Sequence, residues 1–158
     1  MNILSWLIWG FVSTIVLTTL LAGSQGLKWT RMNIPYMLGT MITPNRDRAK
    51  IIGIFFHLFN GFVFSLIYIG VFTALHEFHW YIGAILGFIH ALFMLAVGLP
   101  ALPGMHPRMA GEQSGPTVTR QLEPPGFFCL NYGMQTPLSI IIAHVVFGII
   151  LGTFYSPN

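Results

Sequence analysis

The stretch HLFNGFVFSLIY, residues 57–68, decides how this sequence is interpreted. Its polar and small residues recur at steps of three or four, which places them on one face of an α-helix: His57, Gly61, Ser65 and Tyr68. The same stripe returns near the end of the sequence: His144, Gly148, Gly152 and Tyr155. Each stripe lies in an apolar run long enough to cross a bilayer, so the two helices that carry them are predicted to be membrane spans.

The composition indicates that lipid surrounds most of the protein. Of the 158 residues, 54% are hydrophobic and 7% are charged, whereas soluble domains carry about a quarter of charged residues. The formal net charge is +3 with only seven Lys and Arg. So few cations, without a basic-aromatic array, favour contact with anionic lipid headgroups and argue against nucleic acid as a partner. The single cysteine, Cys129, excludes an internal disulfide.

The apolar runs predict an all-α polytopic membrane protein with one domain that covers residues 1–158. At 1.5 Å per residue, a run of 20 residues reaches across a hydrocarbon core of about 30 Å. The very short connector 76–79 requires the second and third spans to run antiparallel, and the four spans form two tandem hairpins. The expected spans are residues 3–22, 51–75, 80–99 and 138–155.

The two longer linkers differ in character. Within residues 23–50, Asn33 is a candidate cap and Pro35 a first-turn residue of a short helix lying on the membrane surface. Residues 104–137 are rich in Pro and Gly and predict a long irregular loop. All seven Lys and Arg lie in these two linkers. The positive-inside rule therefore predicts that the linkers are cytoplasmic and that both termini lie on the outer face of the inner (plasma) membrane.

An internal repeat is a further prediction. Residues 10–13 of the first span (GFVS) align with residues 87–90 of the third (GFIH), and the second and fourth spans share the stripe. Two copies of a two-span hairpin would be related by an axis along the membrane normal. The alternative is that Gly and aromatic residues recur by chance in an apolar sequence.

Three histidines fall within the predicted spans: His57, His90 and His144. Charged groups are costly inside a bilayer, so such residues are candidates for function. Three interpretations remain open. The imidazoles can be neutral packing elements that hydrogen-bond across helices. His57 and His144 can be axial ligands of a b-type haem, or can hold a metal ion together with His90. Alternatively, the three histidines line a path for protons or a small solute.

Small residues at four-residue steps predict close contacts between helices. The candidates for helix packing are Gly61, Ser65, Gly83, Gly87, Gly148 and Gly152. We also expect Gly61, Gly148 and Gly152 to leave room for a flat macrocycle. No catalytic residue is predicted, because the four acidic residues are scattered in loops and neither a nucleophile elbow nor a phosphate-binding loop is present.

The sequence resembles a family of short four-span prokaryotic inner-membrane proteins that is classed as a domain of unknown function. The resemblance rests on GFVST at residues 10–14, on His57-x3-Gly61, on the Pro-Gly break after the third span and on the closing segment 137–155. It covers the four spans but not the loop 108–128, and His90 departs from the family pattern. The resemblance implies four helices and membrane residence, and it implies no activity.

These features favour an accessory or assembly subunit of a larger membrane complex, with other membrane subunits or further copies of this chain as partners. The small lipid-spanning body, the Gly-lined helix faces and the long polar loop motivate this hypothesis. A haem- or metal-binding redox protein using His57 and His144 is the first alternative, and a small transporter or channel component is the second.

Overall fold

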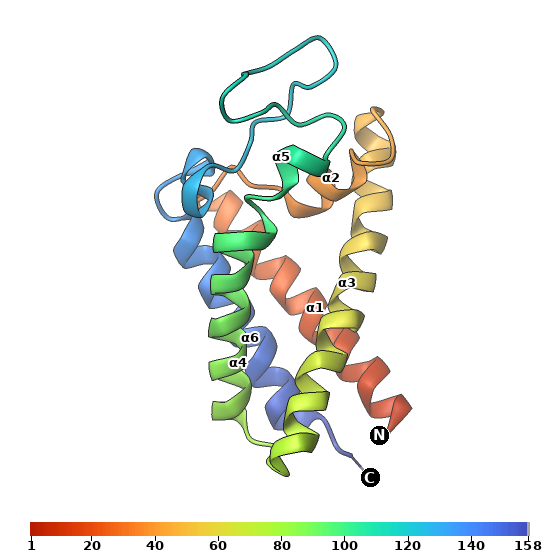
Figure 1. Cartoon of the computed structure of the whole chain (residues 1–158). Helices are drawn as coiled ribbons and strands as arrows, with labels where there is room; N and C mark the ends of the chain where they lie inside the picture. The colour runs from red at the N-terminus through yellow and green to blue at the C-terminus, as the bar shows by residue number, and fades with distance from the viewer. Residues whose placement is uncertain (158) are drawn as a thin grey trace.

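Four long helices form the body of the protein in the computed structural model, which describes residues 1–157 (Figure 1). Each is long and apolar enough to cross a membrane, so the predicted all-α, four-span architecture is confirmed. Both termini lie at one end of the bundle, here called the terminal end, and the long linkers lie at the opposite loop end (Figure 1). The four helices are α1 (Ile3–Gly26), α3 (Arg46–Leu75), α4 (Trp80–Phe93) continued by η1 (Met94–Gly98), and α6 (Thr136–Phe154).

Asparagine side chains begin three of the helices. The Oδ1 atoms of Asn2 and Asn45 each accept a hydrogen bond of 3.0 Å from the backbone N–H three residues further on, at the starts of α1 and α3. The short helix α2 (Ile34–Gly39) begins in the same way, with Asn33 as its cap and Pro35 in its first turn. Such caps satisfy N–H groups that have no partner within the helix. The predicted helix start at Asn33 is therefore confirmed.

Two of the long helices extend by about a turn beyond the predicted spans, and α6 begins at Thr136, just before its predicted start at residue 138. Helix α1 continues through Gly26 and ends before Lys28, whose φ of 62° is left-handed. Its last turn is held by the side-chain amide of Gln25, which donates to the carbonyl oxygen of Met32 at 2.5 Å. Helix α3 begins at Arg46, five residues before the predicted start, because the Asn45 cap lies outside the apolar run. Hydropathy alone marks only the lipid-embedded part of a helix.

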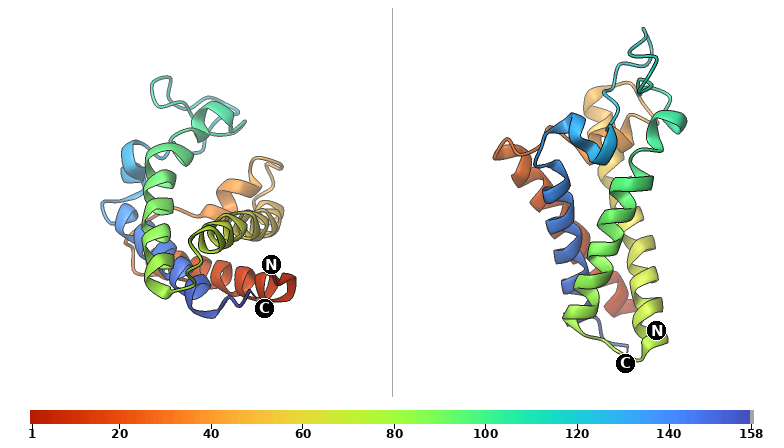
Figure 2. Two further views of the ribbon diagram at one scale, coloured as in Figure 1. Left: turned by 60° about the horizontal axis from the view of Figure 1, so that its bottom comes forward. Right: turned by 60° about the vertical axis from the view of Figure 1, so that its left-hand side comes forward.

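The four long helices form an open arc. Helix α4 packs along α6, and α1 packs against both α6 and α3. With the terminal end turned forward, α4, α6, α1 and α3 follow one another around the arc (Figure 2). Helices α3 and α4 leave their short connector and diverge toward the loop end (Figure 1). A two-fold duplication would pair α3 with α4 as closely as α1 with α6, and the packing does not do so. The internal repeat stays a prediction.

Short elements close the loop end of the bundle. Helix α2 packs on α3 at two glycines: a Cβ on Gly39 would lie 1.7 Å from the carbonyl oxygen of Ala49, and a Cβ on Gly53 would lie 1.6 Å from that of Pro35. One face of the predicted surface helix is thus covered by protein. The long loop is irregular, as expected, except for α5 (Leu102–Met105) and the 3-10 segment η2 (Phe127–Tyr132).

Candidate functional site

A pocket of about 210 Å³ is lined by residues of both α3 and α4, the two helices that diverge as a wedge toward the loop end (Figure 1). Each of the four long helices contributes to its lining, and Met37, Leu38 and Leu102 close it toward the loop end. Most of the lining side chains are apolar, and none is Asp, Glu, Lys or Arg. The polar groups that line it are one threonine, one asparagine and three histidines: Thr14, Asn60, His57, His90 and His144.

Two of the histidines form a close pair. The rings of His90 and His144 meet edge to face, with centroids 4.6 Å apart and an interplanar angle of 82°. Nδ1 of His144 donates a hydrogen bond of 2.8 Å to the carbonyl oxygen of Ile140, one turn earlier in α6. Nδ1 of His90 lies 3.2 Å from the hydroxyl of Tyr68 on α3. The close pair is therefore His90 with His144, whereas the sequence had suggested His57 with His144.

His57 lines the same pocket nearer the loop end. It precedes Phe64 by seven residues, about 10 Å along α3, and the ring centroid of Phe64 lies 4.1 Å from that of His90. Nε2 of His57 and Nε2 of His90 are both buried and have no hydrogen-bond partner in the described chain. A buried polar atom without a partner costs about 1–3 kcal/mol. The three predicted histidines thus share one pocket, and two of them present unsatisfied nitrogens.

The residues present do not fit a haem. The pocket volume of about 210 Å³ is below the roughly 300–1,000 Å³ that sites for drug-sized molecules occupy, and a haem is at least as large as such a molecule. The glycines expected to make room for a macrocycle are filled by neighbouring helices. A Cβ on Gly61 would lie 2.0 Å from Oγ1 of Thr14, and one on Gly148 would lie 1.9 Å from the carbonyl oxygen of Gly83. The expectation of free space there was wrong, because glycines in membrane helices serve close helix contact.

A metal site is not supported by the geometry either. Within residues 1–157, no three side chains of His, Cys, Asp or Glu are grouped so that they could hold one metal ion. The predicted site of His57, His90 and His144 therefore lacks the convergence that a metal ion requires, although the three side chains line a common pocket.

The contact between α4 and α6 is made by glycines. A Cβ on Gly83 would lie 2.0 Å from the carbonyl oxygen of Gly148, and a Cβ on Gly87 would lie 2.3 Å from that of His144. Gly152 meets the carbonyl oxygen of His79, at 2.4 Å from its hypothetical Cβ. The small-residue steps bring the two backbones into direct contact, which holds His90 and His144 against each other.

The contact between α1 and α3 uses the stripe in residues 57–68. Gly61 receives the side chain of Thr14, whose hydroxyl donates to the carbonyl oxygen of Gly10 at 2.6 Å. Ser65 is fully buried and accepts a hydrogen bond of 2.8 Å from Nε1 of Trp6. This contact sets the rotation of α3 about its axis, so that the face that carries His57 is turned toward the pocket.

Sequence reasoning missed the π-helical segment η1, which follows α4 without interruption. The backbone N–H of Leu99 donates to the carbonyl oxygen of Met94 at 2.9 Å, which is the five-residue spacing of a π-helix. Met94, Gly98 and Leu99 all line the pocket. The only signal in the sequence is Pro100, two residues after this segment, and a proline does not by itself predict a wider helical turn.

Sequence reasoning also missed the role of His106. This side chain is fully buried. Its Nε2 donates to the carbonyl oxygen of Met37 at 2.9 Å, and its Nδ1 accepts from the backbone N–H of Arg108 at 3.1 Å. The guanidinium of Arg108 donates to the carbonyl oxygen of Thr40 at 2.6 Å. These bonds fasten the long loop to α2 and so close the loop end of the pocket.

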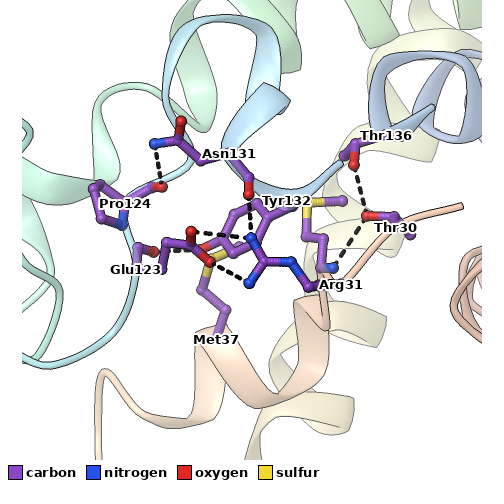
Figure 3. Close-up of polar contacts among 9 residues, drawn as sticks. Thr30, Arg31, Met37, Glu123, Pro124, Asn131, Tyr132 and Thr136 are labelled. Carbon is purple, nitrogen blue, oxygen red and sulfur yellow. Dashed lines mark hydrogen bonds and ion pairs between the residues drawn. The ribbon is translucent and has the colours of Figure 1, made fainter. Parts of the chain in front are cut away.

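A second polar cluster joins the two linkers (Figure 3). Arg31 forms an ion pair of 3.1 Å with Glu123 and also donates to the carbonyl oxygen of Asn131. Beside it, the hydroxyl of Thr136 donates to that of Thr30 at 2.8 Å. Figure 3 shows these side chains between the start of α6 and the linker that precedes α2. The cluster ties the long loop to the first linker.

Comparison with known proteins adds no assignment. A scan of protein-family models and searches for similar curated proteins and similar solved structures found no match. The resemblance to short four-span inner-membrane proteins therefore stays a prediction.

Proposed function

We propose that this small integral membrane protein binds a small, uncharged molecule from the bilayer in the histidine pocket. The observation that carries the proposal is the pair of buried nitrogens, Nε2 of His57 and Nε2 of His90, that have no partner in the chain. Unsatisfied buried groups are rare in native proteins and call for an explanation. A bound molecule that hydrogen-bonds to both nitrogens would provide one.

The lining of the pocket supports an uncharged ligand. No charged side chain lines it, and burying a charge without a counter-charge is strongly unfavourable in a low-dielectric site. An apolar enclosure with a few polar groups is also the usual character of a small-molecule site. The π-helical wall is a further indication, since π-bulges are frequent at functional sites.

The test is direct analysis of what the protein retains. The full chain is purified in lipid nanodiscs, and bound small molecules are extracted and identified by mass spectrometry. We expect one neutral compound at near-stoichiometric level in the wild-type protein, and its loss in His90→Phe. His79→Gln is the matched control, because His79 is an exposed histidine outside the pocket. Equal small-molecule content in wild type and His90→Phe would contradict the proposal.

We further propose that the protein acts as an accessory or assembly subunit of a larger complex in the inner membrane, with both termini on the outer face. The loop end supports this role. Residues 112–114 and 116–121 are exposed and belong to a loop that projects beyond the helices (Figure 1), while His106 and Arg31 fasten its base. A projecting polar segment on a fixed base is suited to docking.

Purification in a mild detergent tests the subunit role. A tagged wild-type chain is expected to bring down a companion membrane protein, and a chain in which residues 112–121 are replaced by a short Gly-Ser linker is expected to lose it. A wild-type chain that is monodisperse and alone would argue against the subunit role. It would leave the ligand-binding proposal intact.

A further inference from the structure

The hydrogen-bond polarity of the pocket narrows the class of its ligand, on the assumption that the proposed function holds. Nδ1 of His144 faces the carbonyl oxygen of Ile140, which can only accept. Nδ1 of His144 therefore carries the proton. The Nε2 atom of His144 is left as an acceptor.

The Tyr68–His90 contact can be made in two ways. If the Tyr68 hydroxyl donates to Nδ1 of His90, the only group left without a partner is the Nε2–H of His90. If Nδ1 donates instead, both the Tyr68 proton and the Nε2 lone pair are left without partners. The first arrangement leaves fewer buried groups unsatisfied and is favoured for that reason. It presents His90 to the pocket as a hydrogen-bond donor.

His57 offers a second donor, about 10 Å along α3 from the level of His90. His57 makes no hydrogen bond that fixes its tautomer, so its unpartnered Nε2 can carry the proton. Asn60, one turn further on, adds a carboxamide to the lining. The two donors come from opposite walls of the wedge, α3 and α4, and a ligand that satisfies both needs acceptors at opposite edges.

The space between the donors suits one substituted ring. The ring of Phe64 and that of Phe147 line the pocket beside His90. A cavity of about 150 Å³ with apolar walls holds benzene, so a volume of about 210 Å³ accommodates a substituted six-membered ring. Because α3 and α4 both line the pocket and diverge toward the loop end (Figure 1), an apolar substituent can extend from it between these helices into lipid.

We propose that the pocket binds the head ring of a lipid-soluble quinone. One carbonyl oxygen accepts from Nε2–H of His90 and the opposite one from Nε2–H of His57. Any apolar tail leaves between α3 and α4. The quinone carries no charge and has two acceptors and no donor. This matches a pocket without charged residues in which Nε2 of His57 and Nε2 of His90 are the buried atoms without a partner. The proposal concerns binding and assigns no electron transfer to the chain.

The experiment compares two uncharged, tetramethylated six-membered rings, one with carbonyl oxygens and one without hydrogen-bond acceptors. Duroquinone is a tetramethylated benzoquinone. Durene is the corresponding tetramethylbenzene, an aromatic ring of nearly the same size that carries hydrogen atoms in place of the two carbonyl oxygens. Each is titrated into the full chain in nanodiscs, and binding is measured by calorimetry and by the shift in thermal unfolding. We expect duroquinone to bind one per chain and durene to bind at least tenfold more weakly, which corresponds to about 1.4 kcal/mol.

Variants connect the binding to the two histidines. His90→Phe is expected to weaken duroquinone binding about tenfold and to leave durene binding unchanged. His90→Gln, which retains a donor, is expected to restore most of the affinity. His79→Gln should match wild type. If His90→Phe is not monodisperse, His57→Phe on the opposite wall makes the same comparison.

The outcomes separate the two proposals. Equal affinity for duroquinone and durene, or equal affinity in His90→Phe and wild type, overturns the quinone assignment. In that case a different neutral compound retained by the purified protein still supports the ligand-binding function. No binding of either ring together with no retained compound overturns both.

Discussion

Replacing Gly148 by alanine tests the packing that positions the histidine pair. A Cβ at this position would lie 1.9 Å from the carbonyl oxygen of Gly83, whereas ordinary van der Waals contact begins at 3.4 Å. The shortfall is about 1.5 Å. The obstructing atom belongs to the backbone, so no side-chain rotation relieves the clash, and α4 and α6 must move apart.

The magnitude follows from two opposing effects. Overpacking a close contact costs about 1–3 kcal/mol. Alanine recovers up to about 1 kcal/mol in helix propensity relative to glycine. Because the obstructing atom is backbone, we take the upper part of the overpacking range, about 2–3 kcal/mol. After the gain in propensity, Gly148→Ala is expected to lower the free energy of unfolding by about 1–2 kcal/mol. Gly70→Ala is the matched control, because Gly70 lies within α3 and nothing would be within 4 Å of its Cβ. It should be neutral or slightly stabilising.

The assay is reversible unfolding in mixed micelles, with SDS as the denaturant and helicity as the signal. Gly83→Ala gives a second check, because its Cβ would meet the carbonyl oxygen of Gly148 at 2.0 Å. The double variant is expected to cost less than the sum of the single variants, since one alanine already separates the helices. If Gly148→Ala is as stable as Gly70→Ala, the inferred contact between the two backbones is refuted.

Three further predictions concern the loop end. Burial raises the pKa of the Cys129 thiol to about 12, so at pH 8 only about one thiol in ten thousand is ionised. Maleimide labelling of Cys129 should therefore be at least tenfold slower in the native protein than in SDS. Equal labelling rates would contradict the burial of this thiol. His106→Ala should cost about 1–3 kcal/mol and expose the long loop to limited proteolysis. The backbone N–H of Arg108 loses its acceptor, and the carbonyl oxygen of Met37 keeps only the hydrogen bond from the Thr40 hydroxyl. Glu123→Gln, in an exposed ion pair, should cost less than about 1 kcal/mol, and the reverse order of the two costs would refute this assignment. Gly126→Ala should destabilise the loop, since the φ of Gly126 is 71° and a Cβ there would lie 2.5 Å from the side chain of Asn131. An unchanged thermal unfolding temperature would contradict this prediction.

The sequence by itself determined the four spans, their order and the side on which the cations lie. These features depend on local hydropathy and on the three- and four-residue periodicity of a helix, and neither needs tertiary contacts. The same periodicity placed His57 with Gly61 and Ser65 on one face of α3, and that face is the one that packs against α1 and lines the pocket. The Asn33 cap could also be predicted, because capping acts within a few residues of the chain.

Only the tertiary structure decided which histidines meet and what fills the glycine faces. Both depend on the rotation and tilt of one helix relative to another, which the hydropathy of either helix does not specify. The sequence suggested His57 with His144, but the close glycine contact between α4 and α6 brings His90 against His144 instead. The buried bonds of His106 join residues nearly seventy positions apart. No local pattern encodes such a contact, since it forms only when the loop folds back on α2.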